Sequence, residues 1–262
     1  MQQHHSHSAL VKAISASNSS KMEQPTGTLS IVSTPIGNLG DFSKRAIQCL
    51  KQAHLVACED TRHSGMLLRA YDIQTRRISL HQHNEASRTV QLLEMLSSGK
   101  NIAYISDAGT PLVSDPGARL VHLAGESGFQ IEVIPGACAV ISALAGAGFP
   151  ADRFYFGGFL STKKTARTKE LQYALDLEVT SVHFESPHRI ESTLLLLSNL
   201  NPERPVVVAR ELTKKFEEFR RGSAQSLAES FRQKRTKGEI VLVISGSRIP
   251  AWMKGSKPQK TN

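Results

Sequence analysis

Five adjacent residues at positions 59–63, Glu-Asp-Thr-Arg-His, place two carboxylates, an arginine and a histidine directly after the apolar run 54–58. Carboxylates and histidine are among the side chains that accept a proton from a hydroxyl nucleophile. Asp60 also occupies the expected N-cap of a following helix, where Asp accepts hydrogen bonds from free backbone N–H groups. Helix capping explains one of these residues but not all of them, so the segment predicts a reactive site.

A second polar segment, SDAGTPLVSDPG at 106–117, follows the apolar run 101–105. It is too long for a simple turn, it repeats the order Ser-Asp, and Pro111 and Pro116 stiffen it. A long, stiffened loop at the end of a strand is more often functional than not. We therefore expect this loop to bind a ligand.

Two glycine-containing segments complete the set, TPIGNLGD at 34–41 and PGACA at 135–139. Glycine lets the backbone approach a ligand closely, and the Pro-Gly turn places small residues at the start of a helix. Such a helix start presents bare N–H groups that suit an adenine or a carboxylate. Taken alone, 34–41 also fits an ordinary strand-to-helix turn. Cys138 has no basic neighbour in sequence, so it fits a small buried side chain better than a nucleophile.

The chain around these segments alternates between apolar runs and amphipathic stretches. Strands are expected at 29–34, 54–58, 77–80, 101–105 and 130–134, and helices at 43–53, 61–70, 85–98, 117–127 and 136–147. Gly99 and Gly128 stand where two of these helices would end. The alternation predicts a mainly parallel sheet covered on both faces. All four polar segments then lie at the carboxyl ends of strands, where open parallel sheets form binding crevices.

The second half repeats the alternation with one difference. Strands are expected at 153–158, 180–185, 205–209, 216–221 and 239–244, and helices at 164–176, 188–199 and 223–235. Because 205–221 contains two strands without a helix between them, the second sheet should be mixed. The fold class is therefore α/β with two domains. We place them at 28–149 and 150–247, between a disordered tail at 1–27 and a basic tail at 248–262.

The formal net charge of +9 is unevenly distributed. Residues 28–151 are neutral overall, residues 152–247 carry a net +4, and residues 248–262 add four basic groups. Concentrated positive charge favours a polyanionic partner, because lysine and arginine release counterions from phosphates on binding. Solubility alone explains the charge equally well.

Several classes of protein are disfavoured. No stretch approaches the roughly 18–20 apolar residues of a membrane helix. The three cysteines, Cys49, Cys58 and Cys138, lack metal-ligand spacing and fit a reducing, cytoplasmic location. His81, His83 and Asp107 could suggest a zinc hydrolase, but no convincing third ligand joins the two histidines, so we expect no metal site.

The four segments, together with HQHNE at 81–85, resemble those of the RsmI family (ribosomal RNA small-subunit methyltransferase I) within the tetrapyrrole-methylase-like, class III methyltransferases. The resemblance continues with FESPHR at 184–189, RELTKKFEE at 210–218 and KGEIVLVISG at 237–246, and it covers about Leu29 to Gly246. Two departures are minor: Cys138 stands where Ser is common, and Gly40 precedes Asp41 where Glu is common. Neither position requires a specific side chain for the chemistry.

The resemblance implies a cofactor, a substrate and an assembly. Members of the family bind S-adenosylmethionine in a cleft between two α/β domains and work as homodimers. They methylate the ribose 2′ oxygen of a cytidine in the decoding centre of 16S rRNA. The residues that it implies as cofactor contacts are Pro35, Gly37, Asp107, Gly109, Thr110, Leu112, Gly136, Ala137, Cys138, Ala139, Glu185 and Ser186.

Methyl transfer from a sulfonium is an in-line displacement, so positioning the two reactants can supply roughly 7–11 kcal/mol of the barrier. A ribose hydroxyl is a weak nucleophile, and a positioned base would add about 10²–10⁴-fold. The candidate bases are Glu59, Asp60, His83, Asp107, Glu185 and His188. We favour the carboxylates of Glu59 and Asp60, with Arg62 as the residue that orients them.

The expected RNA contacts are basic residues of the second half: Lys163, Lys164, Arg189, Arg210, Lys214 and Lys215. Lysines at a helix N-terminus are unfavourable, and a phosphate would relieve them. Glu217 and Glu218 partly neutralise the run that begins at Arg210, so a solvated surface of ion pairs is the alternative.

Two rival functions remain. A class III methylase of a corrin precursor would share the cofactor loops but would not need the basic second half. An assembly factor that binds rRNA without catalysis would need the basic residues but not the PGACA turn. Methyl transfer to rRNA excludes the first rival, and binding of S-adenosylmethionine opposes the second.

Overall fold

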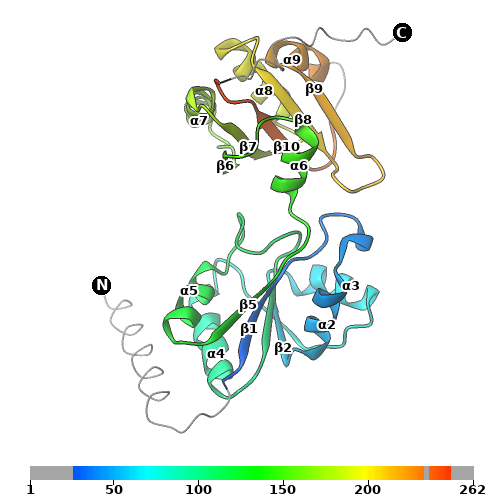
Figure 1. Ribbon diagram of the computed structural model, residues 1–262, viewed down its shortest axis with the longest axis vertical. Coiled ribbons are helices and arrows are strands. Elements are labelled where there is room, and N and C mark those ends of the chain that lie inside the picture. The colour runs from blue at the N-terminus through cyan, green and yellow to red at the C-terminus, as the bar shows by residue number, and fades with distance from the viewer. Residues whose placement is uncertain (1–25, 233–235, 249–262) are drawn as a thin grey trace. The chain divides into compact units, whose positions relative to one another are not determined.

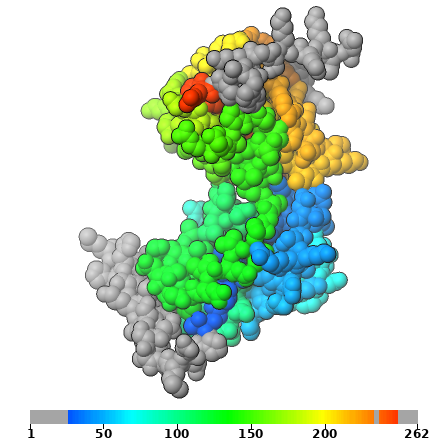
Figure 2. Space-filling model, in the orientation of Figure 1, coloured from blue at the N-terminus to red at the C-terminus, as the bar shows by residue number. Residues whose placement is uncertain are grey.

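The computed structural model describes residues 26–232 and 236–248, and the chain divides into two compact units, Met1–Cys138 and Ala139–Asn262. Each unit has its own five-stranded sheet and its own hydrophobic core (Figure 1). Figure 2 draws them in space-filling form, the first unit in blue to green and the second in green to red. The predicted α/β class with two sheets is confirmed. Most of the two predicted tails lies outside the described residues.

The first unit contains a parallel sheet with the strand order β3-β2-β4-β1-β5. Its strands are β1 (Thr28–Val32), β2 (Leu55–Cys58), β3 (Arg77–Ser79), β4 (Ile102–Ile105) and β5 (Gln130–Ile134). Its helices are the short 3-10 helix η1 (Leu39–Asp41), α2 (Lys44–Gln52), α3 (Thr61–Ala70), α4 (Glu85–Ser97) and α5 (Ala118–Glu126). The expected alternation of strands and helices is confirmed.

Helices cover both faces of this sheet (Figure 1). Leu50 of α2 and Leu68 of α3 belong to the core on one face, whereas Leu92 of α4 and Leu120 of α5 belong to the core on the other. Every residue of β2 and β4 is buried, as expected for inner strands of a parallel sheet.

Local sequence signals set the ends of these helices. The Ser43 hydroxyl accepts a hydrogen bond from the Ala46 N–H at 3.1 Å and so caps α2. Gly99 and Gly128 follow α4 and α5, each with a φ of 77°, a conformation that glycine adopts without strain. Both helix stops were predicted and are confirmed.

The second unit contains a mixed sheet with the order β6-β7-β10-β8-β9, in which only β6 and β7 are parallel neighbours. Its strands are β6 (Phe154–Phe159), β7 (Thr180–Glu185), β8 (Pro205–Arg210), β9 (Glu218–Ser223) and β10 (Ile240–Ile244). Its helices are α6 (Ala139–Ala147), α7 (Lys164–Asp176), α8 (Ile190–Leu200) and α9 (Ala224–Arg232). The last three residues of the helix expected over 223–235 lie outside the described residues.

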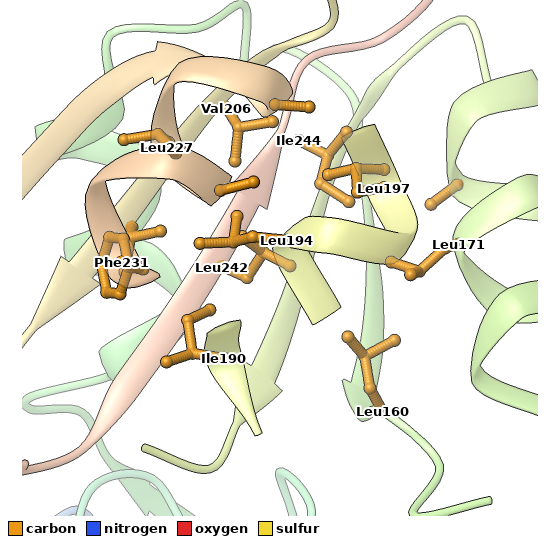
Figure 3. Close-up of a cluster of buried hydrophobic side chains, with 14 of the residues drawn as sticks. Leu160, Leu171, Ile190, Leu194, Leu197, Val206, Leu227, Phe231, Leu242 and Ile244 are labelled. Carbon is orange, nitrogen blue, oxygen red and sulfur yellow. The ribbon is translucent and has the colours of Figure 1, made fainter. Parts of the chain in front are cut away.

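The core of the second unit lies between one face of its sheet and helices α7, α8 and α9 (Figure 3). Leu171, Leu194 and Phe231 come from these three helices and are buried with Leu242 of β10. Burying a large apolar side chain stabilises a fold by roughly 1.5–3 kcal/mol. This second core allows the unit to be compact by itself.

Helix α6 departs from the expected domain organisation. It packs against β7, β8, β9 and β10, so the chain divides before α6 and not at the predicted boundary between 149 and 150. The helix also begins at Ala139, after the 136 expected. The reason is that α6 is apolar on nearly all sides, so its periodicity indicates a helix without indicating which sheet it covers.

One buried side chain in the second unit makes its stability sensitive to pH. His183 on β7 is 2% exposed, and neither ring nitrogen has a hydrogen-bond partner within the part of the chain that the structure describes. A Cβ on Gly157 would lie 2.5 Å from the imidazole ring, so the ring is closely confined. Burial lowers the pKa of His183 from 6.5 to about 4. The folded protein therefore holds this imidazole neutral.

We expect the free energy of unfolding to fall as the pH drops from 6.5 towards 4. In this window the unfolded chain binds a proton at His183 that the folded chain does not, which costs about 3 kcal/mol in full. Denaturant unfolding of wild type and His183→Leu across this range measures the effect. The variant should lack this part of the pH dependence, whereas exposed His63→Gln should keep it. Parallel pH profiles for wild type and His183→Leu would contradict the assignment.

Candidate active site

The first sheet has a topological switch point between β1 and β4. The chain passes from β1 to α2 on one face and from β4 to α5 on the other, although the two strands are neighbours. Connections that leave in opposite directions open a crevice at the carboxyl ends of the strands. The loops that follow β1 and β4 are the predicted segments 34–41 and 106–117.

The loops after β1, β4 and β5 are tied to one another by hydrogen bonds. Thr34 and Gly109 exchange two backbone hydrogen bonds, of 2.9 and 3.1 Å, in an antiparallel bridge. The Thr110 hydroxyl donates to the Ala137 carbonyl oxygen at 3.2 Å, and the Ser33 hydroxyl donates to Thr110 Oγ1 at 3.1 Å. These hydrogen bonds join three of the four segments singled out in the sequence, 34–41, 106–117 and 135–139.

Two glycines permit this close packing. Gly109 has a φ of 82°, and a Cβ there would lie 3.1 Å from Cγ2 of Ile36. A Cβ on Gly136 would lie 2.9 Å from the Cβ of Ser33, a separation that real structures essentially never show. Pro35 is buried in the same region, whereas Gly37 is exposed.

The loop at 106–117 has a strained backbone. Leu112 and Ser114 have φ values of 73° and 69°, a region that residues with a side chain rarely adopt. Gly117 has a φ of 108°, and a Cβ there would lie 2.5 Å from the ring of Tyr104. The Tyr104 hydroxyl holds the loop by donating to the Pro116 carbonyl oxygen at 2.6 Å. Strain of this kind concentrates at functional sites.

Four carboxylates lie near the carboxyl ends of β2 and β4. The Asp60 N–H donates to Asp107 Oδ1 at 3.3 Å, which joins the two predicted acidic segments. Burial, followed by the charges of Asp107, Asp115 and Asp60, raises the pKa of Glu59. Burial and the charge of Asp107 likewise raise the pKa of Asp115, against a hydrogen bond from Ser106.

Asp60 behaves differently from Glu59. Its Oδ1 accepts hydrogen bonds from the backbone N–H groups of Arg62 at 2.7 Å and His63 at 3.4 Å, so it caps α3 as predicted. The Arg62 guanidinium lies 3.4 Å from its Oδ2. These hydrogen bonds, first of all the one from the Arg62 N–H, lower the pKa of Asp60. Asp60 is therefore a weaker proton acceptor than Glu59.

Glu185, the remaining carboxylate among the candidate bases, has its oxygens occupied within the second unit. Its Oε2 accepts from Arg189 Nη2 at 2.7 Å and from the Ser186 N–H at 3.0 Å, and its Oε1 accepts from the Thr193 hydroxyl at 2.6 Å. The side chain of Glu185 is fully buried. Glu185 thus organises the loop after β7 and is a poor candidate for a base. The candidate His188 is exposed in that loop.

The histidines after β3 form a separate group. The rings of His81 and His83 lie 6.0 Å apart, centroid to centroid, and His81 Nε2 lies 3.2 Å from Nδ2 of Asn84. Among the residues that the structure describes, no cluster of three or more His, Cys, Asp or Glu side chains is arranged to hold a metal ion. None of the helices within residues 26–232 and 236–248 has the length and apolarity required to span a bilayer.

The basic run after β8 is largely neutralised. Lys214 Nζ lies 3.0 Å from Glu211 and 3.1 Å from Glu239, and Arg210 Nε lies 3.1 Å from Glu218. Lys215 is exposed instead, with its ammonium 5.6 Å from the centre of the Phe216 ring. The ion-pair alternative therefore describes Lys214 and Arg210 well, and Lys215 poorly.

The second basic group lies at the start of α7. Lys163 and Lys164 are exposed, and Lys163 occupies the N-cap position without a side-chain capping hydrogen bond. Arg167, from the same stretch, is buried, and its guanidinium donates to the Ser161 carbonyl oxygen and to the Ser192 hydroxyl. Among the described residues the two lysines have no ion-pair partner, so they are available to a phosphate, whereas Arg167 serves the fold.

Sequence reasoning missed three residues of this region. Ser33 and Tyr104 hold the loops, and Asp115 contributes to the raised pKa of Glu59. Asp115 had a usable signal, because it belongs to the second Ser-Asp of the repeated order in 106–117. Ser33 and Tyr104 lie within apolar strand patterns and carry no comparable signal.

Known proteins resemble this chain over most of its length. The family model described as Tetrapyrrole (Corrin/Porphyrin) Methylases matches residues 28–228. A "Ribosomal RNA small subunit methyltransferase I" from Synechocystis sp. is 49% identical, covering 84% of this chain and 80% of the relative. A relative of the same name from Haemophilus influenzae is 46% identical, covering 86% and 81%.

A solved structure supports the fold. The uroporphyrin-III-C-methyltransferase from Thermus thermophilus superposes with a TM-score of 0.58 at 20% identity, covering 87% of this chain and 98% of that one. This likeness concerns the fold alone. The family model and the relatives at 46–49% identity show that the chain belongs to the tetrapyrrole methylases and, within them, to the ribosomal RNA small subunit methyltransferase I family.

Proposed function

We propose that this chain transfers a methyl group from S-adenosylmethionine to the ribose 2′-hydroxyl of a cytidine in the 16S rRNA of the small subunit, in the cytoplasm. As a member of its family, the chain is a methyltransferase that uses S-adenosylmethionine. The proposal rests on the loops at 34–41, 106–117 and 135–139, which hydrogen bonds join at the switch point of the first sheet, near Glu59. The names of the relatives favour an rRNA substrate over a corrin precursor.

The loops of the first unit would form a preorganised cofactor site, because Gly109 and Gly136 let them pack where a Cβ would meet Ile36 and Ser33. S-adenosylmethionine supplies a sulfonium-activated methyl group, whose C–S bond breaks as the new C–O bond forms. We assign the cofactor contacts of this unit to Pro35, Gly37, Asp107, Gly109, Thr110, Leu112, Gly136, Ala137 and Cys138. For the second unit we assign Ala139 and Ser186, with Glu185 holding the Ser186 loop in place.

We assign the base to Glu59. Its raised pKa gives its carboxylate a higher proton affinity than that of Asp60, whose pKa is lowered. Glu59 would accept the proton of the 2′-hydroxyl as that oxygen attacks the methyl carbon. Asp60 and Arg62 would position the segment, since Asp60 caps α3 and bonds to Arg62.

Transfer of a labelled methyl group in vitro tests the proposed function. Purified protein, labelled S-adenosylmethionine and either small ribosomal subunits or a precorrin should give labelled rRNA and unlabelled precorrin. Labelled precorrin with unlabelled rRNA would establish the small-molecule rival. Calorimetry without detectable binding of S-adenosylmethionine would favour the non-catalytic assembly factor.

Lys215→Ala should weaken rRNA binding more than Lys214→Ala. Each lost phosphate contact reduces the slope of log K against log[salt] by about 0.7 for a single strand or about 0.9 for a duplex. Lys215 is exposed, whereas the ammonium of Lys214 is held by Glu211 and Glu239. Filter binding across a salt series measures both slopes. Equal flattening by the two variants would show that these ion pairs do not restrain Lys214.

We also infer that the protein acts as a homodimer, through the edge strand β6. Phe154 is 40% exposed, Phe159 is 66% exposed, and Tyr173 of α7 is 53% exposed. Exposed aromatic side chains grouped on one edge are typical of a protein interface. Sedimentation should show a dimer for the wild type and a more weakly associated dimer for Phe159→Ser. A monomeric wild type at micromolar concentration would overturn this assignment.

A further inference from the structure

Helix α3 and the edge strand β3 border an open groove of about 570 Å³, which we call the α3 groove. Its lining residues are Thr61, Arg62, Gly65, Met66, Arg69 and Arg77. Three of the six are arginines and none is acidic. Residues 28–151, which include nearly all of the described first unit, carry no net charge. The positive charge of the groove is therefore a local feature.

Arg77 is the most constrained of the three arginines. Its Nε is buried and has no hydrogen-bond partner among the described residues. Its guanidinium lies beneath Gly65, where a Cβ would come within 3.3 Å of Nη2. A guanidinium remains charged at all ordinary pH values, so leaving it partly buried without a partner is costly. An anion bound in the groove would remove this cost.

Arg62 and Arg69 extend the positive charge along α3. They are seven residues apart, which corresponds to about 10.5 Å along a helix. Within residues 26–232 and 236–248, Arg62 has an ion pair with Asp60, whereas Arg69 and Arg77 have none. Met66 lies between them and is 58% exposed, offering an apolar surface within the same groove.

We propose that the α3 groove binds a phosphodiester of the rRNA substrate, with Arg69 and Arg77 as the contacting residues. This inference rests on the proposed function and locates part of its substrate surface in the first unit. The planar guanidinium donates paired hydrogen bonds to phosphate oxygens. The groove runs from the N-terminus of α3, directly after Glu59 and Asp60, to Arg69 in the last turn of the helix. A phosphate held by Arg69 and Arg77 would therefore lie about two helical turns from the segment that contains Glu59.

The test compares two double variants of the full-length protein. Arg69→Gln with Arg77→Gln should flatten the salt dependence of binding to small-subunit rRNA by about 1.4–1.8 in log–log slope. Affinity at fixed salt should fall at least tenfold, with unchanged binding of S-adenosylmethionine. The matched control, Lys100→Gln with Arg119→Gln, removes two exposed positive charges elsewhere on the same unit and should leave the slope nearly unchanged.

A third variant guards against misfolding of the Arg77 variant. Gly65→Ala adds one methyl group 3.3 Å from the Arg77 guanidinium, and alanine is a better helix former than glycine. The Gly65→Ala variant should bind rRNA more weakly than the wild type and keep the wild-type circular dichroism spectrum. Wild-type rRNA affinity and salt slope in both Gly65→Ala and Arg69→Gln would overturn the proposal. Variants that change oligomeric state but bind rRNA like the wild type would overturn it as well. A wild-type protein that methylates no rRNA would instead refute the proposed function.

Discussion

Replacing Glu59 by Gln is expected to lower single-turnover methylation of small-subunit rRNA by about 10²–10⁴-fold. The substitution preserves size and removes the proton affinity that burial and the neighbouring carboxylates raise. Binding of S-adenosylmethionine and of rRNA should remain, so the loss should fall on the chemical step. Rapid-quench measurement with enzyme in excess over rRNA isolates that step.

Asp60→Asn is the matched control for this experiment. Asparagine caps a helix about as well as aspartate, so α3 should be preserved. Because the pKa of Asp60 is lowered, its loss should reduce the rate much less than the loss of Glu59. The wild-type rate should also fall as the pH drops through the raised pKa of Glu59, and this fall should disappear in Glu59→Gln. A larger defect in Asp60→Asn than in Glu59→Gln would reverse the assignment.

Gly136→Ala is expected to weaken S-adenosylmethionine binding at least tenfold, which corresponds to about 1.4 kcal/mol. The added Cβ would lie 2.9 Å from the Cβ of Ser33 and 3.5 Å from its carbonyl oxygen. The loop after β5 must then shift away from the loop after β1, and with it the bond between Thr110 and Ala137. Isothermal calorimetry gives the affinity directly.

Gly125→Ala provides the comparison. A Cβ on Gly125 of α5 would lie 3.6 Å from Cδ1 of Ile131 on β5, an ordinary van der Waals contact. This variant should bind S-adenosylmethionine like the wild type, and both variants should retain their circular dichroism spectra. Unchanged affinity in Gly136→Ala would mean that the Pro-Gly turn serves the fold only.

Much of the fold was predictable because local signals and tertiary structure agree. The parallel sheet followed from the alternation of strands and helices, and the positions of Gly99 and Gly128 marked two helix ends. The convergence of 34–41, 106–117 and 135–139 followed from one rule, that the carboxyl ends of parallel strands share an edge. Asp60 was predictable as a cap because capping depends on its neighbours in sequence.

The partners of charged side chains were not predictable in the same way. Lys214 meets Glu239 across a separation of 25 residues, and this pairing depends on how β8, β9 and β10 lie together. The sequence shows that Glu185 is acidic, but not that Arg189, Ser186 and Thr193 occupy its oxygens. Arg77 is a further example, since only the packing of α3 on β3 places it beneath Gly65.

The most direct test of this account uses small ribosomal subunits from a strain that lacks the gene for this protein. Incubation with the purified protein and S-adenosylmethionine, followed by nuclease digestion and mass spectrometry of the rRNA, locates any added methyl group. We predict one methylated cytidine with the methyl group on the ribose 2′ oxygen, and almost none with Glu59→Gln. A methyl group on the base, or no methylation of the rRNA by the wild type, would contradict the account.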